Sequence, residues 1–186
     1  MPPRKLPELL LDPEAASRIE VRGAVPAAVL VALYRRKGEL YTVLTERHND
    51  LSRHAGEISF PGGRRDPQDP DLVATALREA DEEIGLPPDK VKIVGGLQPT
   101  PTMVTGYAIY PFVGMIPASQ KWRPNGGEVE QVLELSLPAL TAGYERRRIV
   151  RRGMPIWTDT YVVDEHLVWG ATARILADLL ERVAKL

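Results

Sequence analysis

Residues Gly62 to Leu86 read GGRRDPQDPDLVATALREADEEIGL, a glycine-rich loop that leads into a predicted helix. Between Asp71 and Ile84 the apolar residues recur at steps of three and four, the pattern of one buried helical face. These apolar residues are Val73, Ala76, Leu77, Ala80 and Ile84. Asp69 or Asp71 can cap the start of the helix, and Gly85 followed by Pro87 ends it. The stretch therefore predicts a loop and a helix with one face in the core.

Three glutamates share the side of this helix opposite the apolar face. Glu79, Glu82 and Glu83 lie within about a third of a turn of one another. Like-charged pairs at these spacings cost a helix roughly 0.2–0.5 kcal/mol each, and Arg78 is the nearest cation in the sequence. A solvated acidic face is the simpler interpretation. The alternative is a site for divalent cations, because Mg²⁺ and Mn²⁺ prefer oxygen ligands and would relieve the repulsion between carboxylates.

Length and composition favour a single globular domain over residues 1–186, with an N-terminal arm over residues 1–22. The chain has 186 residues, of which 44% are hydrophobic and 26% charged. A formal net charge of -1 favours neither nucleic acid nor an anionic membrane as a partner. The sequence leaves the oligomeric state open, with a homodimer as one option.

The cell compartment is predicted from the absence of cysteines and of a long apolar stretch in the sequence. It has no cysteine, so disulfides and thiol chemistry play no part. Charges and prolines interrupt the leucine run near the N-terminus, and no apolar stretch approaches ~20 residues. We expect a cytoplasmic protein. The final residues Ala184-Lys185-Leu186 are similar to a peroxisomal address, but they also finish a predicted amphipathic helix.

Short strands alternate with turn signals along the rest of the chain. They are predicted at Val25 to Tyr34, Leu40 to Arg47, Glu57 to Phe60, Val91 to Leu97, Tyr107 to Met115, Glu128 to Leu135 and Trp157 to Val163. The first strand is apolar on both faces, which indicates a central strand covered on both sides. A short N-terminal helix is expected to end near Asp12-Pro13, and another short helix or turn begins at Leu137.

A long amphipathic helix is predicted at the C-terminus, from Trp169 to Leu186. Its apolar residues are Ala173, Leu176, Ala177, Leu180 and Val183. Many strands, one internal helix and one terminal helix fit the α/β class, with a mixed β-sheet sandwiched between α-helices. No repeat or low-complexity linker points to a second domain.

The segment READEEIGL, from Arg78 to Leu86, together with Gly62-Gly63 resembles the Nudix box. In that motif a glycine and then a glutamate precede R-E-x-x-E-E-x-G and an aliphatic residue. The family has its first glutamate six residues after the glycine and nine before the glutamate of R-E. Here those two places hold Asp69 and Pro70, so one residue is inserted and an aspartate replaces a glutamate. The sequence leaves the role of Asp69 open.

Other segments resemble the coenzyme A pyrophosphatase branch of the same family. Leu44-Thr45-Glu46-Arg47 and GEISFPGG, residues 56–63, are similar to the signature that precedes the box in that branch. Further similar segments are YAIYPFVG at residues 107–114 and WGATA at residues 169–173. His48 and Ser52 stand where the branch has a small residue and a second arginine, and Arg53 follows one place late.

The resemblance implies a Nudix fold and a diphosphatase that depends on Mg²⁺ or Mn²⁺. The substrate it implies is coenzyme A or a derivative, split into 3′,5′-ADP and (acyl-)4′-phosphopantetheine. One alternative keeps the chemistry but acts on ADP-ribose or another nucleoside diphosphate derivative. A second alternative is a non-catalytic nucleotide-binding module, which we rank lower because such modules usually lose box glutamates and this chain keeps Glu79, Glu82 and Glu83.

The resemblance also implies roles for individual residues. Glu79, Glu82 and Glu83 would bind the metal, with the Gly62 carbonyl as a further oxygen ligand. Arg78 would orient Glu79 or Glu82 through a charge-assisted hydrogen bond. A carboxylate bound to a metal is a poor base. The general base is therefore expected to be Glu128, with Glu130 as the alternate, or whichever box glutamate is not ligated.

Substrate phosphates need donors, for which Arg47, Arg53, His54 and the amide of Gly63 are the candidates. The arginine-rich segment YERRRIVRRG, from Tyr144 to Gly153, is either a solvated hairpin or a further phosphate clamp. For Tyr107, Tyr110 and Phe112, the alternatives are packing in the core and contact with the adenine or pantetheine of the substrate.

Overall fold

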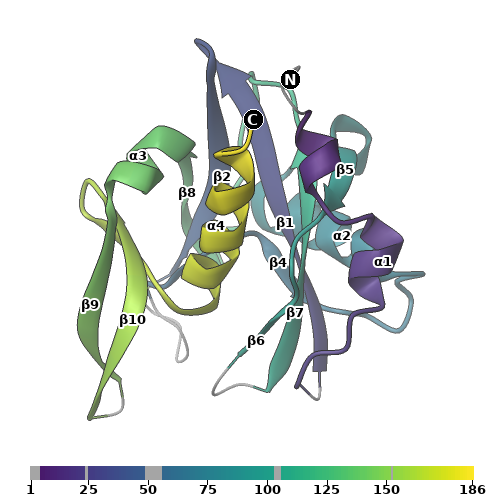
Figure 1. Ribbon diagram of the computed structural model, residues 1–186. Coiled ribbons are helices and arrows are strands. Elements are labelled where there is room, and N and C mark those ends of the chain that lie inside the picture. Colours follow the sequence, from purple (N-terminus) through teal and green to yellow (C-terminus); the bar gives the residue numbers. More distant parts are fainter. Residues whose placement is uncertain (1–4, 24, 49–55, 103–105, 152) are drawn as a thin grey trace.

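The computed structural model describes residues 5–23, 25–48, 56–102, 106–151 and 153–186 (Figure 1), and the side chains of residues 151 and 154 are not described. The strands are β1 (Val25–Arg36), β2 (Glu39–Arg47), β3 (Ile58–Ser59), β4 (Gly62–Arg64), β5 (Lys92–Gly96), β6 (Thr100–Pro101), β7 (Tyr107–Met115), β8 (Val129–Ser136), β9 (Tyr144–Arg151), β10 (Met154–Val163) and β11 (His166–Val168). The helices are η1 (Leu6–Leu9), α1 (Pro13–Ser17), α2 (Leu72–Ile84), η2 (Pro88–Lys90), α3 (Leu137–Ala142) and α4 (Gly170–Val183). The η elements are 3-10 helices.

A mixed eight-stranded sheet forms the centre of the molecule. Its main order is β3-β2-β1-β7-β5, and β4 pairs with β1, β6 with β7 and β8 with β2. β1 pairs antiparallel with β2 and β4 but parallel with β7. The parallel pair is possible because the chain between these two strands is long enough to carry α2 across the sheet. This arrangement brings the short strand β4 to the side of β1.

Two helices cover opposite faces of the sheet, and alternate residues of β1 face them in turn. Val31 and Leu33 belong to the same buried cluster as Leu176 of α4. Leu30 and Ala32, which alternate with them along β1, belong to a second cluster that includes Ala80 of α2. Figure 1 shows α4 in front of the sheet and α2 behind it. The predicted α/β class, a mixed sheet between helices, is confirmed, and so is the central position of the first strand.

A second, three-stranded sheet has the order β11-β10-β9. β9 and β10 form a long antiparallel hairpin that projects from the body of the molecule (Figure 1). At its base Tyr161 is buried in the cluster that includes α4. The hairpin is therefore anchored at one end and extends away from the main sheet at the other.

The N-terminal segment differs from the prediction. Instead of a helix that ends near Asp12-Pro13, α1 begins there, because the Asp12 side chain accepts hydrogen bonds from two amides of its first turn. Leu9 and Ala16 are buried, and Leu11 exchanges backbone hydrogen bonds with Gly96 at an edge of the sheet. The predicted arm thus packs against the domain.

The face that α2 buries also differs in detail from the prediction. Leu72 and Thr75 are buried with Ala76, Ala80 and Ile84, whereas the expected core residues Val73 and Leu77 are only half-buried. The periodicity is helical as predicted, but the buried stripe is rotated toward Thr75. This polar side chain tolerates burial because its hydroxyl donates to Asp69 and to the Asp71 carbonyl.

No helix in the described ranges is long and apolar enough to cross a membrane.

Candidate active site

The helix α2 begins and ends at specific backbone caps. Asp71 accepts a hydrogen bond from the Ala74 amide at 2.8 Å, so Asp71 and not Asp69 is the N-cap. Gly85 ends the helix in the left-handed conformation with φ 66°, which glycine adopts without steric cost. With its apolar stripe packed under β1, the helix turns Glu79 and Glu83 toward β4.

The strand β4 runs between β1 and these carboxylates at very close range. A Cβ atom on Gly62 would lie 2.3 Å from the Ala28 carbonyl oxygen of β1. A Cβ atom on Gly63 would lie 2.5 Å from the carboxylate atoms of Glu79. Without a side chain at either position the backbone passes through this gap unobstructed, which explains the two adjacent glycines in physical terms.

Glu83 is the most perturbed carboxyl group of the site. Its Oε2 accepts a hydrogen bond from the Gly62 amide at 3.2 Å. Burial raises the pKa of Glu83 to about 8, with a further increase from the nearby charges of Glu79 and Glu128, while the Gly62 amide and Arg47 act in the opposite direction. Burial also raises the pKa of Glu79. The site thus gathers carboxyl groups that are costly to ionise together.

Arg78 joins the loop to the helix through several charged contacts. Its Nη1 lies 2.9 Å from Glu79 Oε1 and 3.1 Å from Glu82 Oε2, and its Nη2 donates to the Arg64 carbonyl. Arg78 therefore contacts both Glu79 and Glu82 in this structure. Glu82 is largely exposed, with 57% of its side chain accessible, so it lies at the outer edge of the site.

Asp69 is the residue that holds Arg78, a contact that sequence reasoning missed. Both carboxylate oxygens of Asp69 accept from Arg78, at 3.0 Å each, in a two-pronged ion pair. Thr75 and the Asp66 amide also donate to Asp69, which is 7% exposed. The Arg78 hydrogen bonds hold the pKa of Asp69 well below its usual range. The indication in the sequence was that Asp69 lies six residues after Gly63, where the Nudix box has a glutamate.

A second segment, distant in the sequence, brings further charged groups to the site. Glu128 lies 3.8 Å from Arg47 and is close enough to raise the pKa of Glu83 and Glu79. Glu130, the alternate, lies 3.0 Å from His48 Nε2 instead. The pairing of β8 with β2 explains this arrangement, since Glu128 immediately precedes β8 and Glu130 is its second residue, beside the end of β2.

The remaining candidate residues from the sequence lie in different parts of the chain and do not form one cluster with the carboxylates in the described residues. Phe112 is fully buried in the core cluster beneath α2, and the Tyr110 hydroxyl donates to the Ile19 carbonyl. The Tyr107 hydroxyl accepts from Arg64 Nε at 2.5 Å. Arg53 and His54 lie outside the described residues. The arginine-rich segment belongs to the second sheet, not to the sheet that carries β4.

The donor set of this site suits a hard divalent cation. Its oxygen ligands would be carboxylates, and the burial that makes Glu83 costly to ionise is relieved by an adjacent positive charge. In the described part of the chain, no three His, Asp or Glu side chains are already gathered closely enough to hold a metal ion. Glu79 and Glu82 are instead paired with Arg78.

Comparison with known proteins gives a consistent result. The family described as NUDIX domain matches residues 24–152. The Nudix hydrolase NudL of Salmonella paratyphi B, described as uncharacterized, is 42% identical over 157 residues, covering 82% of this chain and 80% of the relative. NudL of Salmonella newport matches to the same extent, at 42% identity over 157 residues with 82% and 80% coverage.

Solved structures are similar at lower sequence identity. The NUDIX domain of Shewanella oneidensis NrtR, in complex with ADP ribose, has a TM-score of 0.57 at 16% identity, covering 94% of this chain and 92% of that one. An Ap4A hydrolase of C. elegans, solved as a binary complex, has a TM-score of 0.52 at 18% identity, covering 62% and 82%. At such identities the likeness shows a shared fold.

Proposed function

This chain belongs to the Nudix family, and from that membership we propose that it hydrolyses the pyrophosphate bond of coenzyme A or its thioesters. The products would be 3′,5′-ADP and 4′-phosphopantetheine or its acyl form. Nudix hydrolases act on phosphorus-containing anhydrides and generally use divalent metal ions. The proposal adds the substrate, the metal and the roles of individual residues.

One observation carries the proposal: a glycine pair and two half-buried glutamates of α2 meet at one point. Glu83 accepts from the Gly62 amide, and Gly63 passes directly against the Glu79 carboxylate. A negatively charged diphosphate would repel these carboxylates, so its binding here requires a cation between them. We also propose the Gly63 amide as a donor to a phosphate oxygen.

We assign Mg²⁺ or Mn²⁺ to Glu79, Glu82 and Glu83, with the Gly62 carbonyl as a further oxygen ligand. When bound, such a cation acidifies a water nucleophile and screens the diphosphate. Glu79 and Glu82 would first exchange their contacts with Arg78 for the cation. Asp69 keeps Arg78 in place during this exchange, because it holds the guanidinium by two separate hydrogen bonds.

Glu128 is proposed as the general base that takes the proton from the attacking water. It is not one of the assigned metal ligands, it is 51% exposed, and it lies close to Arg47. These properties leave it accessible to water beside the buried glutamates. Arg47 is proposed to bind a substrate phosphate together with the Gly63 amide, and Arg53 and His54 are proposed for the same purpose on sequence grounds.

Coenzyme A, rather than another nucleotide, is supported by the segments that resemble the coenzyme A branch. Residues 44–47 lie at the end of β2, and residues 58–63 form β3 and the start of β4. The second segment ends in the glycine pair, and Thr45 of the first segment pairs with Ser59 of the second. A substrate with a 3′-phosphate needs donors beyond those that hold the diphosphate, and Arg47, Arg53 and His54 are competing candidates for this contact.

The experiment is a substrate panel with the full chain. Coenzyme A, dephospho-coenzyme A, ADP-ribose and diadenosine compounds are incubated with Mg²⁺, and products are separated and quantified. We expect turnover of coenzyme A to 3′,5′-ADP, faster than that of the dephospho form. Glu83→Gln is expected to lower kcat by about 10²–10⁴-fold. Asp81→Asn, an exposed position on the same helix, serves as the matched control and should retain activity.

Each of the other possible results of this substrate panel would change a different part of the proposal. Preference for ADP-ribose or a diadenosine compound would replace the substrate but keep the site. Equal rates with coenzyme A and its dephospho form would contradict recognition of the 3′-phosphate. Full turnover in the presence of a chelator would contradict the metal assignment. If no compound is turned over but one binds, the chain is a nucleotide-binding module.

A further inference from the structure

The hairpin β9–β10 carries most of the exposed large apolar side chains. In the described part of the chain five such side chains are exposed, and four of them lie on this hairpin: Tyr144, Val150, Ile156 and Trp157. Val150 is 73% exposed and Trp157 is 65% exposed. Contiguous exposed apolar residues usually mark an interaction surface, whereas isolated ones do not.

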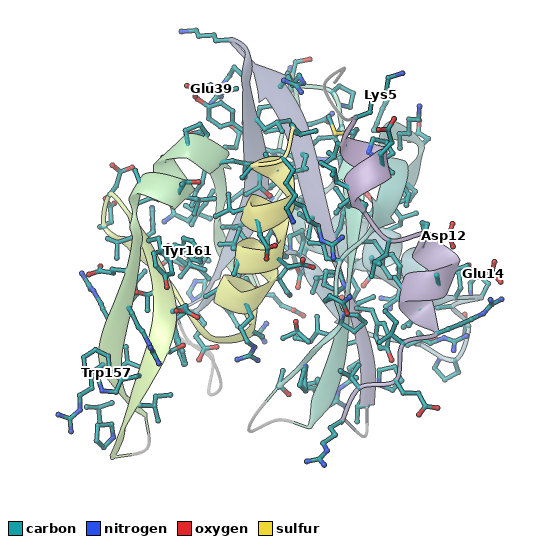
Figure 2. All side chains as sticks on the ribbon, in the orientation of Figure 1. Lys5, Asp12, Glu14, Glu39, Trp157 and Tyr161 are labelled. Atoms are coloured by element: carbon teal, nitrogen blue, oxygen red, sulfur yellow. The ribbon has the colours of Figure 1, made fainter. Side chains whose placement is uncertain are left out.

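The strand register places apolar residues on both faces of the outer part of the hairpin. Val150 is opposite Pro155 and Arg148 is opposite Trp157, on one face. Ile149 is opposite Ile156, on the other face. In Figure 2 Trp157 lies on the outer part of the hairpin and points away from the body of the molecule, whereas Tyr161 lies near the base.

The same hairpin is basic, although the chain as a whole is not. Residues 144–163 contain five arginines against Glu145 and Asp159, a net charge of +3, whereas the whole chain has a net charge of -1. Arg146, Arg147 and Arg148 are all exposed. Arg147 lies 2.6 Å from Glu145. Arg146, Arg147 and Arg148 therefore precede Val150 along β9, toward the base of the hairpin, and Arg151 directly follows it.

We propose that the outer part of this hairpin docks on an anionic lipid membrane. Apolar side chains on both faces fit a medium that surrounds the hairpin, whereas a flat protein surface would cover only one face. Tryptophan prefers the boundary between lipid and water, and arginines beside it would contact lipid phosphates. A second copy of the chain is a poorer partner, because two hairpins would bring their arginines together.

This inference is independent of the hydrolase activity, and it revises the expectation that no membrane takes part. That expectation follows from the net charge of the whole chain. The hairpin differs because its positive charge and its apolar side chains are concentrated in one projecting element. Attraction to an anionic surface decays within about a Debye length, so the charge of the nearest element matters more than that of the whole chain.

The test is co-sedimentation of the full chain with vesicles. We expect binding to phosphatidylcholine vesicles that contain about one-third phosphatidylglycerol, and weak binding to pure phosphatidylcholine. Trp157→Ala, and separately Arg146→Gln with Arg148→Gln, should lower the bound fraction roughly five- to tenfold. Controls are Leu186→Ala, the exposed apolar residue away from the hairpin, and Arg18→Gln, an exposed arginine near the N-terminus.

Thermal unfolding of every variant shows that a loss of binding is not a loss of fold. No sedimentation with anionic vesicles at low salt would overturn the proposal. Binding that neither hairpin variant weakens would overturn it as well, because another surface would then be responsible. So would light scattering that detects a dimer abolished by Trp157→Ala without any vesicle binding, since the patch would then belong to a second copy.

Discussion

At the scale of single residues, Asp69 connects the loop of the candidate site to its helix. Its carboxylate accepts from Arg78 twice, from Thr75 and from the Asp66 amide. All of its partners are donors, so the ionised form is favoured although the group is almost fully buried. Arg78 in turn contacts Glu79 and Glu82. Asp69 is thereby linked through Arg78 to two glutamates that it does not touch.

Replacement of Asp69 by asparagine tests this positioning role. The substitution keeps the shape but removes the charge that Arg78 faces, and breaking one side of a largely buried ion pair costs about 2–4 kcal/mol. We expect a loss of that size in the free energy of unfolding, measured by urea titration. We also expect kcat to fall about 10–100-fold, because Arg78 would no longer be held beside Glu79.

Asp66→Asn is the matched control for this substitution. Asp66 is exposed, and its side chain accepts one hydrogen bond, from the Gln68 amide. Its replacement should cost at most about 1 kcal/mol and leave kcat unchanged. A neutral effect of Asp69→Asn on both stability and kcat would mean that Arg78 is held by its other contacts alone.

At the scale of elements, the site depends on how closely β4 approaches α2. β4 has only three residues and pairs with β1 through Val29, Ala28 and Ala27. A strand this short gives little pattern in the sequence, and the prediction placed a loop there. Its position is specified by the two glycines, which fit between the backbone of β1 and the carboxylate of Glu79.

The two glycines should respond differently to alanine. The Cβ of Gly62→Ala would lie 2.3 Å from the Ala28 carbonyl oxygen, and backbone atoms of a central strand cannot easily move. We expect a loss of about 1–3 kcal/mol in unfolding free energy. The Cβ of Gly63→Ala would meet the movable end of Glu79 instead. We expect less than about 1 kcal/mol lost, but a 10–100-fold lower kcat, since the carboxylate is displaced.

Urea titration and steady-state kinetics separate the two effects. Gly126→Ala is the control, because a Cβ there meets nothing within 4 Å. Equal stability losses at Gly62 and Gly63 would show that Glu79 is as rigid as the backbone. Unchanged kcat in Gly63→Ala would remove Glu79 from the proposed site.

At the scale of the whole molecule, the sheet and its two helical layers determine how far water is excluded from the site. Glu83 is next to Ile84, which is fully buried beneath β1, and it accepts from the backbone of β4. Its carboxyl is therefore held at the edge of the core. Burial of this kind is a property of the assembled domain, and it gives the stability of the metal-free protein a characteristic pH dependence.

We expect the metal-free protein to lose stability as the pH rises. The pKa of Glu83 is raised by burial from 4.5 to about 8. Between these values the folded protein keeps a proton that the unfolded chain has released, so the free energy of unfolding decreases with rising pH. Glu79, with a pKa also raised by burial, acts in the same direction. Thermal unfolding in chelator, from about pH 5 to about pH 9, measures the slope.

Glu83→Gln provides the comparison, because glutamine does not titrate. Its unfolding temperature should depend less on pH across the same window. Added Mg²⁺ should stabilise the wild type most at the alkaline end, where the carboxylates are ionised and available as ligands. An identical slope in the wild type and the variant would show that Glu83 is not the group responsible.

The sequence by itself determined most elements and the chemical character of the site. β7 matches its predicted bounds, and β1, β2, α2 and α4 lie where periodicity and turn residues predicted them. Periodicity and caps are local, because they depend on residues within one or two turns. The cluster of glutamates on α2 was equally visible. Both the family resemblance and the fold class followed from such local patterns.

Only the tertiary structure decided which of these groups contact one another and how far they are shielded from water. The Asp69–Arg78 pair joins positions 9 residues apart, and the Gly62–Glu83 hydrogen bond joins positions 21 apart. The rotation of the α2 stripe toward Thr75 and the packing of the N-terminal segment were likewise not predicted. Such contacts depend on how β4, α2 and β1 pack, and packing is a property of surfaces brought together in space. The raised pKa of Glu83 exists only after that packing has excluded water.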